Sequence, residues 1–373
     1  MKRLALLLGC GVALLAAAAL VCGRPVAWVQ AALIMWDIAA GGERTLWQDV
    51  TAAPHERLVR WPDGEGDLYL PVGKVGAAMV LVPGAAILGR DEPRLRALAR
   101  TFARAGFAVL VPELPELRRL ALSRVDADRV AVALRYLGGQ QQGAPLGVAA
   151  ISYAVAPAVI AAIEDDLAPR IAFVVGIGGY RDTESVIRFV TTGAFRPRGD
   201  AREFRVEPNH YGRWAFVMAN AGRLDSPADA VLLDDIARQR FRDRDADISR
   251  QVAALGPQGR AVLALMENRD PDAVTRLIQA LPEGVRREID GLNLAFYDLS
   301  KLGGHLILVH GRTDPMVPYS ESQDLAVAAS RARVSLFLID DIGHVEFTAV
   351  NIRNARTMWQ AIVALLGERS IRF

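Results

Sequence analysis

One serine lies where the local sequence pattern could support a nucleophile. Ser152 follows a short apolar run, residues 146–151, and precedes a small-residue stretch that is typical of a helix. A strand that turns sharply into a helix exposes the hydroxyl and points the first free N–H groups of the helix at the group under attack. The usual pattern for such a turn is G-x-S-x-G, and this chain has Ala150 and Ala154 in place of the glycines. A serine at this junction can also be an ordinary helix N-cap.

Two later segments supply the partners that a serine nucleophile requires. An apolar run at 305–310 is followed by G-R-T-D-P-M-V-P, which places Asp314 on a loop beyond a buried strand. A second run at 334–340 is followed by a loop that contains His344. A serine hydroxyl needs a base whose pKa lies near 7, and a carboxylate that holds the imidazole in the required tautomer. The pattern therefore predicts a catalytic triad of Ser152, His344 and Asp314.

Other acids and histidines of the chain are further candidates for the same roles. Asp340 and Asp341 precede His344 directly and remain reserve candidates for the acid. The remaining histidines are expected at packing, hairpin, surface or pocket-wall positions: His305 and His310 in the strand before Asp314, His55 at the start of a hairpin, and His210 in a helical segment.

The order Ser, Asp, His, with each residue placed after a strand, resembles that of the α/β-hydrolases. The resemblance covers about residues 57–178 and 306–366 and is nearest to serine esterases, lipases and dienelactone-hydrolase-like proteins. The dienelactone type has a cysteine where this chain has Ser152, so its substrate does not carry over. The resemblance implies a serine hydrolase that cleaves a carboxylic ester, or a related acyl bond, through an acyl-enzyme and without a cofactor or metal. An acyltransferase or thioesterase would use the same triad, and an inactive binding module of the cell envelope is the alternative of a different class.

Acyl transfer also needs hydrogen-bond donors for the oxyanion of the tetrahedral intermediate. The amide of Tyr153, directly after the nucleophile, is one expected donor. The second is expected from the loop after the first buried strand, where Gly84 allows close approach and Ala85 supplies the amide. Many α/β-hydrolases have His-Gly where this chain has Pro83-Gly84, and a plain strand-exit turn is the alternative reading.

The elements that must position these residues alternate along the chain. Alternating strands and helices predict an α/β fold with a mostly parallel, doubly wound sheet and reacting groups at the carboxyl ends of its strands. The predicted series is an opening hairpin at 57–61 and 67–70, strands at 77–82, 107–111, 146–151 and 171–175, and helices at 92–105 and 126–137.

Between residues 178 and 300 this alternation stops. Helical patterns dominate there, for example at 228–241 and 272–281. The sequence therefore predicts a helical cap, residues 180–300, inserted after the sixth strand of a core formed by residues 45–179 and 301–373. By analogy with α/β-hydrolases, such a cap is expected to cover the site and shape the substrate pocket.

An apolar N-terminal segment, residues 1–41, precedes the core. The uncharged stretch 4–22 is long enough to cross a bilayer as a helix, either as an anchor or as a signal peptide cleaved near the small residues 16–19. A second apolar stretch, 26–40, contains Trp28 and Trp36, and because indoles prefer the membrane interface it favours a retained anchor. The body is then expected on the exported side, in the periplasm or another extracytoplasmic space.

Composition limits the partners. The formal net charge is only +2 and arginines alternate with acids, so nothing predicts nucleic-acid binding. Both cysteines, Cys10 and Cys22, lie in the N-terminal segment, which excludes disulfides and cysteine-bound zinc from the body. The expected partners are a small-molecule or lipid-like acyl substrate and, through the N-terminal segment, a membrane. The oligomeric state is left open.

Overall fold

A computed structural model describes residues 25–84, 87–121, 123–340 and 352–370 of the chain. The predicted membrane segment 4–22 and both cysteines lie outside these residues. No helix in the described part of the chain combines the length and the apolar character that crossing a bilayer requires.

One eight-stranded sheet forms the centre of the molecule, in the order β1-β2-β4-β3-β5-β6-β9-β10. β2 pairs antiparallel with β1 and β4, and every other neighbouring pair is parallel. This strand order is that of the α/β-hydrolase fold, so the predicted fold class is confirmed. The strands are β1 (His55–Trp61), β2 (Gly64–Leu70), β3 (Ala77–Val82), β4 (Phe107–Pro112), β5 (Leu146–Ile151), β6 (Ile171–Ile177), β9 (His305–Gly311) and β10 (Arg333–Ile339).

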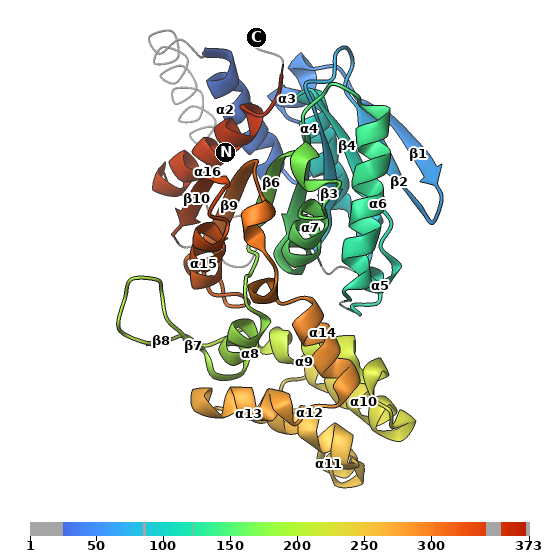
Figure 1. Ribbon diagram of the computed structural model, residues 1–373, viewed down its shortest axis with the longest axis vertical. Helices are drawn as coiled ribbons and strands as arrows, with labels where there is room; N and C mark the ends of the chain where they lie inside the picture. Colours follow the sequence, from blue (N-terminus) through green and yellow to red (C-terminus); the bar gives the residue numbers. More distant parts are fainter. Residues whose placement is uncertain (1–24, 85–86, 122, 341–351, 371–373) are drawn as a thin grey trace.

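Helices cover both faces of the sheet, as Figure 1 shows. All six residues of β3 are buried, because alternate side chains enter two separate apolar clusters. One cluster is covered by α6 (Val125–Gln140), α7 (Val155–Ala162) and α15 (Ser320–Ala328). The other is covered by α2 (Pro25–Ala39), α4 (Pro93–Arg104) and α16 (Ile352–Leu366).

Helix α2 is part of this body. Trp28 meets Trp359 of α16 edge to face at 4.8 Å, and the Trp359 indole N–H donates to the Trp28 carbonyl at 2.9 Å. Ala31 and Ile34 are fully buried in the same cluster as α4. Trp28 therefore packs against the body. The expected position of this helix at a membrane interface stays a prediction.

The chain between β6 and β9 forms mainly helices, which Figure 1 shows gathered beyond one end of the sheet. They have an apolar cluster of their own. The helices are α8 (Thr183–Thr192), α9 (His210–Asn220), α10 (Pro227–Arg242), α11 (Ser249–Ala254), α12 (Pro257–Glu267), α13 (Val274–Gln279) and α14 (Glu283–Gly291), with a short hairpin of β7 (Ala194–Phe195) and β8 (Phe204–Arg205). The domain boundaries at 180 and 300 stay a prediction.

Candidate active site

Ser152 has a left-handed backbone, with φ of 56°. It directly follows β5 and begins a 3₁₀ turn, Ser152–Ala154, that continues directly into α7. For a residue with a β-carbon this conformation costs about 1 to 2 kcal/mol, so it persists only where the surrounding structure enforces it. A helix N-cap instead has an extended backbone. The predicted sharp strand-to-helix turn is thus present, and the ordinary N-cap reading does not fit.

Small residues allow this turn to close. Ala150 and Ala154 are each 1% exposed, and Ala150 pairs with Val82 on one side and Gly176 on the other. Every residue of α7 is buried against the sheet and its neighbours. Alanines therefore fit where the usual pattern has glycines, and the departure from G-x-S-x-G does not prevent the turn.

The loop after β3 reaches the same point. A β-carbon added to Gly84 would lie 3.4 Å from the Ile151 carbonyl oxygen and 3.8 Å from the β-carbon of Ser152. These are ordinary van der Waals distances, so the loop lies against the Ser152 turn, and a requirement for glycine at position 84 stays a prediction. Ala85, the expected second oxyanion donor, lies outside the described residues, so its role stays a prediction. Tyr153, the expected first donor, follows Ser152 in the 3₁₀ turn.

Asp314 is held on a buried turn beyond β9. It is 4% exposed, and its Oδ1 accepts hydrogen bonds from the amides of Met316 at 2.7 Å and Val317 at 3.0 Å. β9 is separated from β5 only by β6, and the three strands are parallel. Asp314 and Ser152 therefore lie at the same edge of the sheet, beyond the carboxyl ends of their strands.

The other candidate acid in the described chain is differently placed. The Asp340 side chain is 41% exposed and forms an ion pair with Arg312 at 3.1 Å. This surface pairing makes it a weaker candidate than Asp314. Asp341 and His344 lie outside the described residues. The end of β10, which precedes them in the chain, lies beside the loop that carries Asp314. Ile339 is paired with Gly311 there, and the Arg312 amide donates to the Ile339 carbonyl at 2.8 Å.

A buried histidine lies next to Asp314. His310 is 1% exposed, and its Nε2 lies 2.9 Å from the Val317 carbonyl oxygen and 3.5 Å from Asp314 Oδ2. Its Nδ1 lies 2.7 Å from the Ser322 hydroxyl. The sequence predicted only that His310 packs. Its contact with the acid was missed, because the residues that meet it belong to the following turn and helix.

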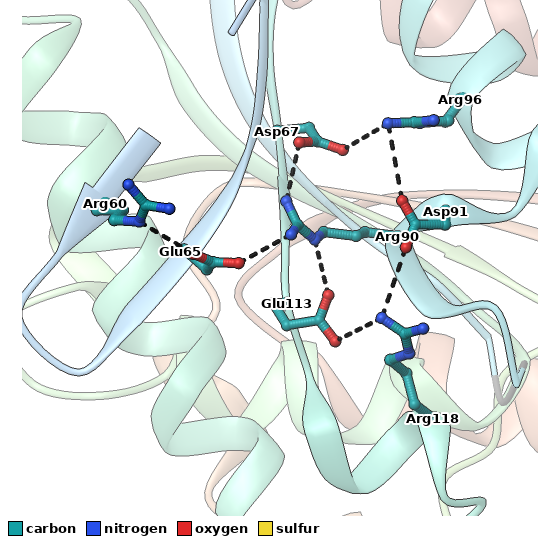
Figure 2. A network of polar contacts seen from close by, with 8 residues as sticks. All are labelled: Arg60, Glu65, Asp67, Arg90, Asp91, Arg96, Glu113 and Arg118. Carbon is teal, nitrogen blue, oxygen red and sulfur yellow. Dashed lines mark hydrogen bonds and ion pairs between the residues drawn. The ribbon is translucent and has the colours of Figure 1, made fainter. Parts of the chain in front are cut away.

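Arg90, in the 3₁₀ turn Gly89–Asp91, is the centre of the ionic network in Figure 2. Arg90, whose side chain is 16% exposed, binds Glu65 at 2.8 Å, Asp67 at 2.9 Å and Glu113 at 2.7 Å. These carboxylates come from β2 and from the residue after β4. Burial alone would lower the pKa of Arg90, but the three carboxylates raise it above its usual value. The network thus holds the 3₁₀ turn Gly89–Asp91 against the sheet.

The helical insertion is tied to the core near the acid loop. Glu321 of α15, 2% exposed, accepts hydrogen bonds from the amides of Arg181 at 3.0 Å and Asp182 at 2.8 Å, at the start of the insertion. Burial raises the pKa of this carboxyl. The Asn209 amide, before α9, donates to the Pro315 carbonyl at 2.8 Å. The insertion therefore contacts the turn that carries Asp314.

A second buried carboxyl lies close to the nucleophile turn. Asp126, in the first turn of α6, is 1% exposed. Burial raises its pKa to about 7, although the Ser123 amide and Arg129, 4.0 Å away, act in the opposite direction. The Tyr153 hydroxyl donates to the Ser123 carbonyl at 3.3 Å, so the Tyr153 side chain extends to the same turn. Burial also raises the pKa of Tyr153.

His210 begins α9 of the helical insertion. The Nε2 of His210 lies 2.7 Å from the Arg240 carbonyl, and its ring meets Trp214 edge to face, so this half-buried histidine belongs to the packing of the insertion. The described residues hold no group of three or more side chains suited to binding a metal ion.

Comparison with known proteins gives matches only among solved structures. No family model matches the sequence, and no curated protein does. The chain is similar to the Pyrococcus horikoshii acylaminoacyl peptidase, with 13% identity over 86% of this chain and 42% of that one, and a TM-score of 0.47. It is also similar to a Mycobacterium tuberculosis puromycin-hydrolyzing peptidase, with 15% identity over 84% of this chain and 39% of that one, and a TM-score of 0.46. A third similar structure is carboxyl esterase 2 of the fungus Tuber melanosporum, with 12% identity over 90% of this chain and 97% of that one, and a TM-score of 0.49. The chain thus spans about two fifths of the length of the two peptidases.

Proposed function

We propose that this chain, with its α/β-hydrolase fold, is a serine hydrolase that opens a carboxylic ester or related acyl bond through an acyl-enzyme on Ser152. The observation that carries the proposal is the left-handed backbone of Ser152 at the junction of β5 and α7. A structural turn would relieve this strain by having glycine or asparagine at the position. A strained serine at the carboxyl edge of a parallel sheet is the arrangement that exposes a nucleophile.

The proposed reaction uses three side chains and two amides. His344 removes the proton from the Ser152 hydroxyl as its oxygen attacks the carbonyl carbon, and Asp314 stabilises the imidazolium that forms. The amides of Tyr153 and Ala85 bind the oxyanion. When the tetrahedral intermediate collapses, His344 passes its proton to the departing alcohol. Water, activated by the same imidazole, then hydrolyses the acyl-enzyme and restores Ser152.

Ester hydrolysis by the purified chain tests this proposal. A series of p-nitrophenyl esters of increasing acyl length is offered to the wild type and to Ser152→Ala. We expect the wild type to hydrolyse at least one chain length and to react covalently with a fluorophosphonate probe, and the variant to do neither. A folded wild type that is inert to both reagents would favour the inactive binding module. Release of p-nitrophenol with a dependence on added alcohol or thiol acceptors would point to the acyltransferase instead.

We also propose that residues 4–22 anchor the body to a membrane from the exported side. Support comes from the sequence, in which the uncharged stretch 4–22 ends shortly before α2 (Pro25–Ala39), and α2 is bound to the body through Trp28 and Trp359. The full chain should sediment with membranes and resist extraction by alkaline carbonate, whereas a chain starting at residue 25 should not. Recovery of the full chain in the soluble fraction with an N-terminus near residue 20 would instead indicate a cleaved signal peptide.

A further inference from the structure

His310 is a buried polar residue at the carboxyl end of β9, four residues before Asp314. Only 1% of it is exposed, and Ser322, its partner on α15, is fully buried. A buried imidazole is costly unless both ring nitrogens are satisfied, and both are satisfied here. Nε2 contacts the turn that carries Asp314 (the acid turn): it lies 2.9 Å from the Val317 carbonyl oxygen and 3.5 Å from Asp314 Oδ2.

The partners define which ring nitrogen carries the hydrogen. Both neighbours of Nε2 are acceptor oxygens, so Nε2 is assigned the hydrogen, and the Ser322 hydroxyl can then donate to Nδ1. In this tautomer the Nε2–H group donates to Val317 and directs its positive end toward Asp314. Val317 in turn donates its own amide to Asp314 Oδ1 at 3.0 Å. His310 thus acts on the carboxylate twice, once through the turn and once directly.

We infer that His310 is a positioning residue for Asp314, which holds the carboxylate in the orientation that the catalytic imidazole requires. The inference rests on the proposed function and deepens it. Asp314 sits on a turn and not on a regular element, so its carboxylate depends on local hydrogen bonds for its direction. The Met316 and Val317 amides fix Oδ1, and His310 fixes the Val317 peptide and faces Oδ2. A misplacement of about 1 Å in such a constellation lowers the rate by up to about 100-fold.

The same strand offers a matched control. His305 begins β9 and is also buried, at 6% exposure, with hydrogen-bond partners on both nitrogens: Glu368 at 2.7 Å and Ser335 at 2.9 Å. It lies five residues from His310, about 17 Å along the strand and at the opposite edge of the sheet. Substitution of His305 therefore measures what loss of a buried, hydrogen-bonded histidine does to the body without touching the acid turn.

The experiment compares His310→Phe, His310→Gln and His305→Phe in the full chain, with kcat expressed per active site titrated by a fluorophosphonate. We expect His310→Phe to lower kcat by about 10- to 100-fold with little change in KM. The acidic limb of the kcat/KM profile should move to lower pH, because a displaced Asp314 stabilises the imidazolium less. His310→Gln, whose side-chain amide can donate from the position of Nε2, should recover most of the rate. His305→Phe should keep the wild-type kcat per site and pH profile.

Ser322→Ala provides a second variant if His310→Phe does not fold, since it removes the hydrogen-bond partner of Nδ1 and leaves the ring less firmly held. We expect a smaller loss of kcat with the same direction of pH shift. Wild-type kcat per titrated site and an unmoved acidic limb, in His310→Phe or in Ser322→Ala, would overturn the inference. So would an equal loss in His305→Phe. A wild type that neither labels nor hydrolyses esters contradicts the proposed function itself, whereas an active wild type with unaffected variants contradicts only the role of His310.

Discussion

Asp314 accepts a hydrogen bond from the Met316 amide at 2.7 Å, so the carboxylate stabilises the same turn after β9 that carries it. Asp314 is 4% exposed, and this contact satisfies one of its carboxylate oxygens. The carboxylate is therefore held by backbone atoms at the sheet edge that Ser152 shares. The Asp340 carboxylate, by contrast, forms an ion pair with Arg312 at the surface.

Substitution of each acid by its amide separates the two candidates. Asp314→Asn keeps the acceptor for Met316 but cannot stabilise the imidazolium, so we expect kcat to fall by about 10³- to 10⁴-fold. Asp340→Asn should retain kcat within about threefold, because an exposed ion pair contributes little. Steady-state hydrolysis of the best p-nitrophenyl ester measures both. The reverse ranking would make Asp340 the acid.

The strain at Ser152 predicts an order of stability among inactive variants. Glycine adopts φ near 56° without the steric cost that a β-carbon imposes. We therefore expect Ser152→Gly to be more stable than Ser152→Ala by about 1 kcal/mol, with no ester hydrolysis in either. Urea unfolding monitored by tryptophan fluorescence gives the difference. An alanine variant as stable as the glycine variant would mean that the left-handed turn is absent in solution.

The buried carboxyl of Asp126 predicts a pH-dependent stability. Its pKa is raised from 3.8 to about 7, so between these values the folded chain binds more protons than the unfolded one. The stabilisation present below pH 4 is then lost as the pH rises through 7. Asp126→Asn has no carboxyl at this position and does not show this loss. Its free energy of unfolding should therefore exceed that of the wild type by near zero at pH 4 and by as much as about 4 kcal/mol at pH 8.

Unfolding in urea across this pH range tests the expectation. Asp128→Asn is the control, since Asp128 lies two residues further along α6 with its side chain 62% exposed and paired with Arg124. Its effect should be small at every pH. An Asp126→Asn variant whose stability differs from the wild type by the same amount at pH 4 and pH 8 would show that the Asp126 carboxyl titrates normally.

Removal of Arg90 should destabilise the chain more than removal of an exposed arginine. Arg90→Met leaves Glu65, Asp67 and Glu113 close together with only their longer contacts to other arginines. We expect a loss of about 2 to 3 kcal/mol, less than for a fully buried charge because the network is partly exposed. Arg100→Met breaks the exposed pair with Glu56 and should cost less than about 1 kcal/mol. Equal losses would show that the Figure 2 network adds no stability beyond a surface pair.

The elements most accurately predicted from the sequence are the buried parallel strands. The bounds of β3 and β5 agree with the predictions at 77–82 and 146–151, because a strand covered on both faces is a continuous apolar run with polar residues at its ends. Ser152 and Asp314 each follow one of these parallel strands, which predicts that both lie at one edge of the sheet. This follows from topology alone, since parallel strands end on the same side.

Other features depend on contacts that local pattern does not contain. The positive φ at Ser152 is seen only once β5 and α7 are in place, and the local sequence could equally describe an N-cap. The contact of Trp28 with Trp359 could not be predicted, because the two residues lie far apart along the chain. The three carboxylates around Arg90 likewise come from separate strands, and the contact of His310 with Asp314 depends on how the intervening turn folds back.

The central claim is that Ser152 is the nucleophile, and peptide mapping of the fluorophosphonate adduct tests it most directly. Trypsin releases residues 136–170 as one peptide, in which Ser152 is the only serine and no threonine occurs. The account predicts that the adduct mass is found on this peptide at Ser152, at one adduct per chain, and that it is lost in Ser152→Ala. An adduct on any other peptide, or one that persists in Ser152→Ala, would contradict the account.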